Sequence, residues 1–164
     1  MGMNVEEWPF WAQLEAVADR WQLDPYLVAA IVTTESGGDP TAVRYEPGYR
    51  WLFIPKKVKP STCSLPTERM LQKTSFGLMQ VMGAVARERG LEGFITELCF
   101  PVVGLEYGCA HLAKHIKRFR SVERGVSAYN QGSPRKNDAG HFENQPYVDK
   151  VMTLYRRYLG KVGE

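Results

Sequence analysis

The sequence predicts an all-α protein: a single domain of about six or seven helices with one long loop insertion at about residues 39–73. Three observations support this prediction. The chain has 164 residues, enough for one compact domain with a real core. Apolar residues recur at helical spacing through most of the chain. No two segments show the alternating pattern and the short turn of a strand pair.

The net charge is mildly positive. The chain carries 21 Lys and Arg residues against 18 Asp and Glu residues, a formal net charge of +3. This charge would help the protein to approach an anionic polymer such as a bacterial wall. Because the sequence holds no nucleic-acid-reading motif and no long apolar stretch, we expect neither a nucleic-acid partner nor an integral membrane segment. The N-terminus lacks the basic and apolar regions of a signal peptide, so we expect synthesis without one.

Apolar spacing, together with start and stop residues, predicts the helices. Pro101 and Pro146 suit first helical positions, and Gly160 suits a helix end. The polar stretch 132–144 is predicted to be a loop. The predicted helices cover residues 8–22, 25–35, 74–90, 94–98, 101–118, 121–130 and 146–160.

One carboxylate lies at the end of an otherwise apolar helix. Asp24 is a good N-cap and Pro25 fits the first helical position, while Gly37 and Gly38 end the helix. Glu35 therefore lies in the last turn, where the helix dipole and burial would both disfavour its charged form. A carboxyl group with a raised pKa is what a general acid needs near neutral pH. The alternative is an exposed glutamate at a fraying helix end.

The insertion at 39–73 is rich in prolines and aromatic residues. A long excursion of this kind in a small domain is functional or disordered, and its aromatic content argues against disorder. The rings could line a saccharide groove, or they could cap the core. The aromatic residues are Tyr45, Tyr49, Trp51 and Phe53.

The cysteines and histidines do not form a recognisable metal site. Cys63, Cys99 and Cys109 make an odd number in a chain without an export signal, which favours free thiols over a Cys99–Cys109 disulfide. His111 and His115 lie four residues apart on a predicted helix, but the glutamate of the H-E-x-x-H motif is absent. Surface or packing roles are more typical of such a pair, and no metal or organic cofactor is expected.

Four separated stretches carry motifs: ESGGDP at 35–40, SFGLMQVM at 75–82, AYNQG at 128–132 and ENQPYVDKV at 143–151. In this order they resemble the E-S-x-x-N-P, S-x-G-L-M-Q-I-M, A-Y-N-x-G and E-T-R-x-Y-V-x-x-V motifs of the soluble lytic transglycosylases (SLT domains). Asp39 stands where that family usually has Asn, and Asn144 and Gln145 replace its Thr and Arg. The insertion is longer than the family's usual link between the first two motifs.

The resemblance implies a goose-type, lysozyme-like domain over residues 1–164. It also implies cleavage of the β-1,4 bond between N-acetylmuramic acid and N-acetylglucosamine in peptidoglycan. By motif position, Glu35 would be the catalytic acid. The residues implied to contact the substrate are Ser75, Gly77, Met79, Gln80, Tyr129, Asn130, Glu143 and Tyr147.

A second carboxylate would change the reaction. Lytic transglycosylases usually rely on one glutamate and form 1,6-anhydro-muramoyl ends, whereas a hydrolytic muramidase needs another carboxylate to activate water. Glu46, inside the insertion, and Asp39 are the candidates. Their structural alternatives are a salt bridge from Glu46 to Arg44 or Arg50, and a turn cap by Asp39. A third hypothesis is a wall-binding virion protein without activity.

The compact chain, the missing signal peptide and the insertion resemble phage lysis or virion enzymes. This resemblance implies synthesis in the host cytoplasm and action on the cell wall in the periplasm. The protein would be released through a holin or carried in a virion. We expect a monomer whose partner is the glycan strand of peptidoglycan.

Overall fold

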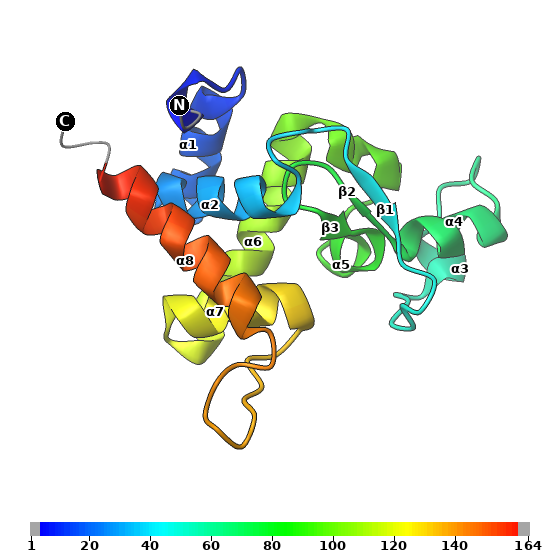
Figure 1. The fold of residues 1–164 in the computed structure, drawn as a ribbon. Helices are drawn as coiled ribbons and strands as arrows, with labels where there is room; N and C mark the ends of the chain where they lie inside the picture. The colour runs from blue at the N-terminus through cyan, green and yellow to red at the C-terminus, as the bar shows by residue number, and fades with distance from the viewer. Residues whose placement is uncertain (1–3, 161–164) are drawn as a thin grey trace. The chain divides into compact units, whose positions relative to one another are not determined.

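The described part of the chain is mostly helical, as the sequence predicts. A computed structural model describes residues 4–160 and has eight α-helices, two 3-10 helices and three short strands over these residues (Figure 1). The sequence predicts an N-terminus without a signal peptide, and the first three residues of this segment lie outside the described residues. The chain groups into two compact units: unit 1 comprises residues 1–34 and 109–164, and unit 2 comprises residues 35–108. The single domain over residues 1–164 stays a prediction.

Unit 1 consists of helices. The first predicted helix, residues 8–22, is shorter in the structure, because Trp8 closes a 3-10 turn and Gln22 has a left-handed φ of 55°. The other helices match their predicted ranges to within two residues. Helix α2 ends, and helix α6 begins, in unit 2. The bounds are η1 Val5–Glu7, α1 Trp11–Arg20, α2 Pro25–Glu35, α6 Pro101–Phe119, α7 Val122–Gln131 and α8 Gln145–Gly160.

Helix α2 is the apolar centre of unit 1, with six consecutive buried residues from Leu27 to Val32. Its predicted cap is confirmed, since Asp24 Oδ1 accepts a hydrogen bond from the backbone N–H of Tyr26 at 2.8 Å. Asp24 Oδ2 accepts a second one from the Tyr155 hydroxyl of α8 at 2.9 Å. Burial and this bond to an anion raise the pKa of Tyr155 to about 12. The start of α2 is therefore attached to α8.

Unit 2 contains a small antiparallel sheet that the sequence analysis missed. The strands, in the order β1-β2-β3, are β1 Val43–Tyr45, β2 Thr74–Phe76 and β3 Val81–Met82. The predicted helix over 74–90 is wrong in its first half, where β2 and β3 stand, and α5 follows at Gly83–Glu88. Gly77 (φ 74°) and Gln80 (φ 48°) have left-handed backbone conformations. Such conformations interrupt a right-handed helix, and here they reverse the chain between β2 and β3.

The insertion at 39–73 is more regular than predicted. It holds β1 and two helices, each with a proline at its first or second position. Proline is favoured there because its missing N–H would have no helical partner. Ser64 caps the second helix through its side chain. The expectation of a loop is wrong for these segments, since their prolines start helices. The helical elements of unit 2 are α3 Pro55–Val58, α4 Leu65–Gln72, α5 Gly83–Glu88 and η2 Ile95–Cys99.

A buried ion pair joins the insertion to the rest of unit 2. The side chains of Glu68 on α4 and Arg87 on α5 are both 0% exposed. They form two hydrogen bonds, Nε to Oε1 at 2.8 Å and Nη2 to Oε2 at 3.0 Å. Arg87 Nη1 also donates to the carbonyl oxygens of Leu91 at 2.5 Å and Gly93 at 2.7 Å. These bonds replace the water that both charges lose on burial.

Gln72 extends this network to the loop before α3. Its Nε2 donates to Glu68 Oε1 at 2.9 Å and to the carbonyl oxygen of Phe53 at 3.1 Å, while its Oε1 accepts from the Phe53 N–H at 2.7 Å. Burial, the largest single influence, raises the pKa of Glu68. The hydrogen bonds from Arg87 and Gln72 and the charge of Arg87 together outweigh it, so this pKa lies below its ordinary value of 4.5.

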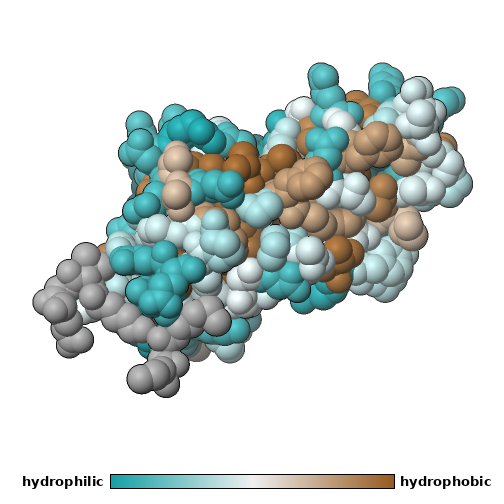
Figure 2. Space-filling view, turned by 90° about the horizontal axis from the view of Figure 1, so that it is seen from above, coloured by the Kyte–Doolittle hydropathy of each residue, from teal (hydrophilic) through white to brown (hydrophobic). Residues whose placement is uncertain are grey.

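Hydrophobic side chains also reach the surface. Figure 2 shows hydrophobic groups among hydrophilic ones on one face of the molecule. No helix described over residues 4–160 combines the length and the apolar character needed to cross a bilayer. The three cysteines, all described, form no disulfide with one another. The large hydrophobic residues exposed in unit 2 are Val43, Tyr45, Trp51, Ile54, Met70, Phe94, Phe100 and Val102.

Removing one partner of the buried ion pair should destabilise the protein. We expect Arg87→Met to lower the free energy of unfolding by about 3–5 kcal/mol, because the Glu68 carboxylate would stay buried without its partner. Chemical denaturation followed by circular dichroism measures the change. Arg69→Met, at an exposed position of α4, is the control and should cost less than about 1 kcal/mol. The double variant Glu68→Leu/Arg87→Met should recover part of the loss; a double variant as unstable as Arg87→Met would contradict this account.

The same pair should make stability depend on acid pH. The pKa of Glu68 is lower in the folded than in the unfolded chain, so its contribution is complete above its ordinary value of 4.5. The contribution is lost as pH falls from there through the folded pKa. Denaturation at a series of pH values should show a steeper loss for the wild type than for Glu68→Leu/Arg87→Met. Parallel curves over this range would show that Glu68 is not the titrating group.

Candidate active site

Glu35, the predicted catalytic residue, lies at the end of a helix, as the sequence predicts. Glu35 is the last residue of α2 and is half-buried. Gly37 and Gly38 follow with left-handed φ values of 66° and 90°. Residues with a side chain would be strained there. These glycines therefore let the chain turn directly after the carboxylate.

Ser36 links the Glu35 segment to the turn between β2 and β3. Its Oγ donates to the carbonyl oxygen of Leu78 at 2.8 Å and accepts from the backbone N–H of Gly38 at 3.2 Å. Ser36 belongs to the first motif and Leu78 to the second, so the structure brings these two motifs together within unit 2. The sequence pattern predicts no role for Ser36, although this residue stands in the ESGGDP motif beside the glutamate.

Ser75 and Gln80 support the same turn from within. Ser75 is buried, and its Oγ donates to Gln80 Oε1 at 2.9 Å. Gln80 Nε2 donates to the carbonyl oxygens of Ala42 and Gly77, each at 3.0 Å. Both ends of the Gln80 amide are thus engaged inside unit 2. These residues hold the turn, and their predicted contact with a glycan stays a prediction.

Gly77 and Met79 lie in the packed part of the turn. A Cβ on Gly77 would overlap the carbonyl oxygen of Leu98. Met79 is 0% exposed, and a Cβ on Gly108 would overlap its side chain. The structure therefore places Met79 in the core of unit 2, and the predicted substrate contacts of both turn residues stay predictions.

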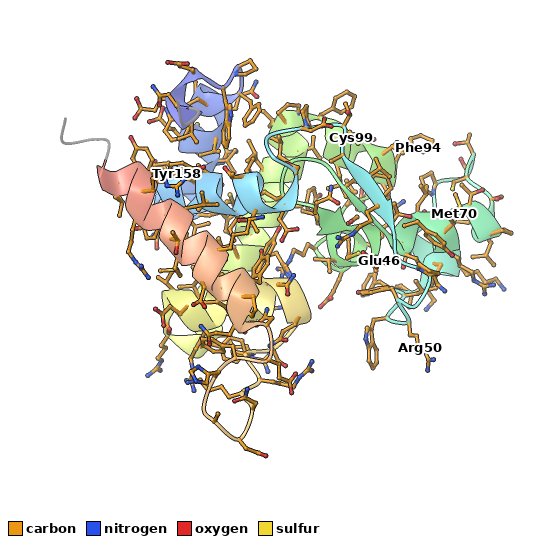
Figure 3. All side chains as sticks on the ribbon, viewed as in Figure 1. Glu46, Arg50, Met70, Phe94, Cys99 and Tyr158 are labelled. Atoms are coloured by element: carbon orange, nitrogen blue, oxygen red, sulfur yellow. The ribbon has the colours of Figure 1, made fainter. Side chains whose placement is uncertain are left out.

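The two candidates for a second catalytic carboxylate both have local partners. Glu46, labelled in Figure 3, forms an ion pair with Arg44, with 2.6 Å from Oε1 to Nε. Asp39 Oδ1 accepts hydrogen bonds from the hydroxyl and the backbone N–H of Thr41, both at 2.8 Å. The two hydrogen bonds hold the pKa of Asp39 below its ordinary value of 3.8, and the bond from the hydroxyl has the larger effect. Both carboxylates thus form the structural contacts that the sequence analysis gave as alternatives.

Asn144 joins the third and fourth motifs in unit 1. Its Oδ1 accepts from the Ser127 hydroxyl at 2.8 Å, and its Nδ2 donates to the Ser127 carbonyl oxygen at 3.1 Å. The same Nδ2 donates to Oδ1 of Asn130, an exposed residue of α7, at 2.9 Å. The predicted site residue Asn130 is therefore held by the residue just before α8. Asparagine is favoured before a helix, and Asn144 also stands in the ENQPYVDKV motif, so the sequence carries two signals for this position.

Glu143 lies in the polar loop 132–144. Its Oε2 accepts from Arg135 Nε at 2.8 Å, and its backbone N–H donates to the Arg135 carbonyl oxygen at 3.0 Å. Lys136 and Phe142 form an antiparallel bridge between the same two arms. The predicted substrate residue Glu143 thus closes the base of a loop, and its contact with substrate stays a prediction.

Tyr129 lies beside the histidine pair of α6. Its ring centroid is 5.3 Å from that of His111, and the Nε2 atoms of His111 and His115 are 3.3 Å apart. His115 stacks on Phe119. Tyr147 lies, half-buried, near the start of α8. Over residues 4–160, no group of three or more His, Cys, Asp or Glu side chains is arranged to hold a metal ion.

Comparison with known proteins agrees with the motifs. Residues 13–148 match the sequence model of the transglycosylase SLT domain. The match covers most of the chain, which therefore belongs to the transglycosylase SLT domain family. A protein of Enterobacteria phage PRD1 named "Transglycosylase" is 27% identical over 154 residues, which are 94% of this chain and 46% of that relative. The chain spans about half the length of the relative.

The turn that carries the second motif should not tolerate a side chain at Gly77. We expect Gly77→Ala to lower the free energy of unfolding by about 1–3 kcal/mol, because of its positive φ and the overlap with Leu98. Gly48→Ala, where a Cβ meets open space, is the matched control and should change stability by less than about 0.5 kcal/mol. Urea denaturation of both variants tests this, and equal stabilities would refute the assigned constraint.

Proposed function

We propose that this protein cleaves the β-1,4 bond between N-acetylmuramic acid and N-acetylglucosamine in peptidoglycan, with Glu35 as the catalytic residue. The observation that carries the proposal is the position of Glu35. It ends α2 inside the ESGGDP motif, and the Ser36–Leu78 hydrogen bond joins that motif to the SFGLMQ turn. Membership of the transglycosylase SLT domain family and the name of the phage relative support the same activity.

The proposed reaction needs one carboxyl group in two protonation states. Protonated Glu35 gives its proton to the glycosidic oxygen as the bond from that oxygen to C1 of the muramic acid breaks. Ionised Glu35 then takes the proton of the C6 hydroxyl of the same sugar. The C6 oxygen forms a new bond to C1 and closes a 1,6-anhydro ring. Water is not consumed, and each proton that leaves Glu35 is replaced by one from the substrate.

The carboxylates near Glu35 in the sequence favour this route over hydrolysis. A hydrolase would need a second carboxylate to activate water or attack C1. The ion pair of Glu46 with Arg44, and the hydrogen bonds from Thr41 to Asp39, give both candidates a structural role. A muramidase that uses Glu46 is the second candidate function, since an exposed ion pair is weak enough to be exchanged for substrate.

The biological role that we propose is lysis of a bacterial host by a phage. The relative from a phage supports this role. The protein would be made in the host cytoplasm and would act on the wall in the periplasm as a monomer, either after release through a holin or from a virion.

Replacing Glu35 tests the site. Glu35→Gln should fold like the wild type and lose about 10²–10⁴-fold in the rate of wall lysis, because glutamine cannot transfer the proton. Turbidity loss of purified peptidoglycan measures the rate, and cosedimentation with peptidoglycan measures binding. Glu46→Gln is the matched control and should stay within about threefold of the wild type, since the Arg44 ion pair is exposed.

The products decide between the two candidate reactions. Mass spectrometry of the released muropeptides should find anhydro ends, one water lighter than hydrolytic products. Reducing ends, together with a loss in Glu46→Gln as large as that in Glu35→Gln, would replace transglycosylation with hydrolysis. Lysis by Glu35→Gln at the wild-type rate would refute the site.

A further inference from the structure

A short segment of the insertion presents cations and hydrophobic groups together. We call residues 50–59 (RWLFIPKKVK), which comprise the loop before α3, α3 itself and Lys59, the basic aromatic loop. Trp51 is 80% exposed, the highest value among the exposed large hydrophobic residues described, and Ile54 is 49% exposed. Arg50, Lys56 and Lys57 are exposed as well. Figure 3 shows Arg50 pointing away from the helices of unit 2.

The positive charge of the protein is concentrated around this loop. Residues 44–73 carry seven Lys and Arg residues against two glutamates, a net charge of +5. The rest of the chain carries fourteen Lys and Arg residues against sixteen acidic ones. Both glutamates of the segment are paired with arginines, Glu46 with Arg44 and Glu68 with Arg87. The cations of the basic aromatic loop therefore belong to a region of strong positive charge in a nearly neutral protein.

The loop is anchored where it meets the buried network. The backbone of Phe53 exchanges two hydrogen bonds with the buried Gln72 side chain, at 2.7 and 3.1 Å. Trp51 and Ile54 lie on either side of this anchor and stay exposed. Ile54 has a left-handed backbone, with φ 29°, which is rare for a β-branched residue and disfavoured before proline. Strained residues persist only where the surrounding structure holds them, so the fold keeps Ile54 in this conformation while its side chain stays exposed.

We propose that the basic aromatic loop docks this protein on the surface of an anionic phospholipid bilayer. Lysine and arginine side chains near such a surface are attracted by its negative potential. Tryptophan prefers the interface between headgroups and acyl chains, and an exposed aliphatic group next to it adds apolar area to insert.

An anionic wall polymer would satisfy the cations but would offer no apolar phase for Ile54. The exposed apolar groups therefore favour the bilayer. Docking through this loop would be peripheral, since it requires no membrane-spanning helix. It is a separate property from cleavage at Glu35, and would hold the enzyme beside the membrane that underlies the wall.

Flotation of the full chain with lipid vesicles tests the proposal. We expect binding to phosphatidylcholine vesicles that contain about one third phosphatidylglycerol, and at least about tenfold weaker binding to phosphatidylcholine alone. Raising the salt from about 0.05 M to about 0.5 M should weaken binding, because the electrostatic attraction is screened. Lys56→Gln/Lys57→Gln should bind about 25-fold more weakly than the wild type, and Trp51→Ala about tenfold more weakly.

Matched variants separate this loop from general effects. Lys114→Gln/Lys117→Gln removes the same charge from exposed positions of α6, and Phe100→Ala removes another exposed aromatic side chain. Both should bind the anionic vesicles like the wild type. Circular dichroism should show that all four variants are folded.

The outcomes are decisive in each direction. Selective loss in the loop variants supports the membrane surface. Equal loss in the α6 control would mean that net charge alone binds the vesicles and would overturn the proposal. Absence of vesicle binding would also overturn it. If Trp51→Ala and Lys56→Gln/Lys57→Gln then bind purified peptidoglycan more weakly than the wild type does, the loop is a wall-polymer surface instead.

Discussion

The guanidinium of Arg87 is the interaction on which unit 2 depends. It neutralises Glu68 on α4 and donates to the carbonyl oxygens of Leu91 and Gly93. Gln72 donates to the same Glu68 carboxylate. Because α4 leads into β2 with one intervening residue, the position of α4 determines where β2 and the SFGLMQ turn lie. A buried pair of this kind adds little net stability relative to apolar packing. Removing one partner is nevertheless strongly destabilising, because it leaves a buried charge without compensation. The insertion is thus an integral part of unit 2, attached to it through an ion pair whose two side chains are fully buried.

The four motifs form two structural pairs. In unit 2, the Ser36 hydroxyl connects ESGGDP to SFGLMQ, and Gln80 connects the turn to Ala42 in the segment that follows ESGGDP. In unit 1, Asn144 connects AYNQG to the start of α8. In each pair, the polar side chains of one motif satisfy backbone groups or amides of the other. The polar residues of these motifs therefore serve as cross-links between segments that are far apart in the chain.

The polar residues of the first two motifs are of two kinds. Ser75 and Gln80 are engaged within the protein, so they act first by fixing the geometry of a turn. Glu35 stands at the end of a helix whose other turns are apolar. A carboxyl group that exchanges protons with a sugar gains from rigid surroundings, because misplacement of the proton donor is costly in rate. Within unit 2, the Ser36–Leu78 hydrogen bond connects the segment after Glu35 to the turn between β2 and β3.

The sequence by itself determined the helices of unit 1, the position of Glu35 and the family. Local signals suffice there: apolar spacing, Asp24 and Pro25 at the start of α2, glycines after its end, and short motifs in a fixed order. It did not determine the strands. Strands β2 and β3 are too short for a periodic signal, and the sequence around them resembles that of a helix that contains glycine. Nor did it determine the Glu68–Arg87 pair, whose members are 19 residues apart on separate helices. These features were decided by tertiary structure, because each side chain finds its partner only after distant elements have packed, and nothing in its own neighbourhood marks that partner.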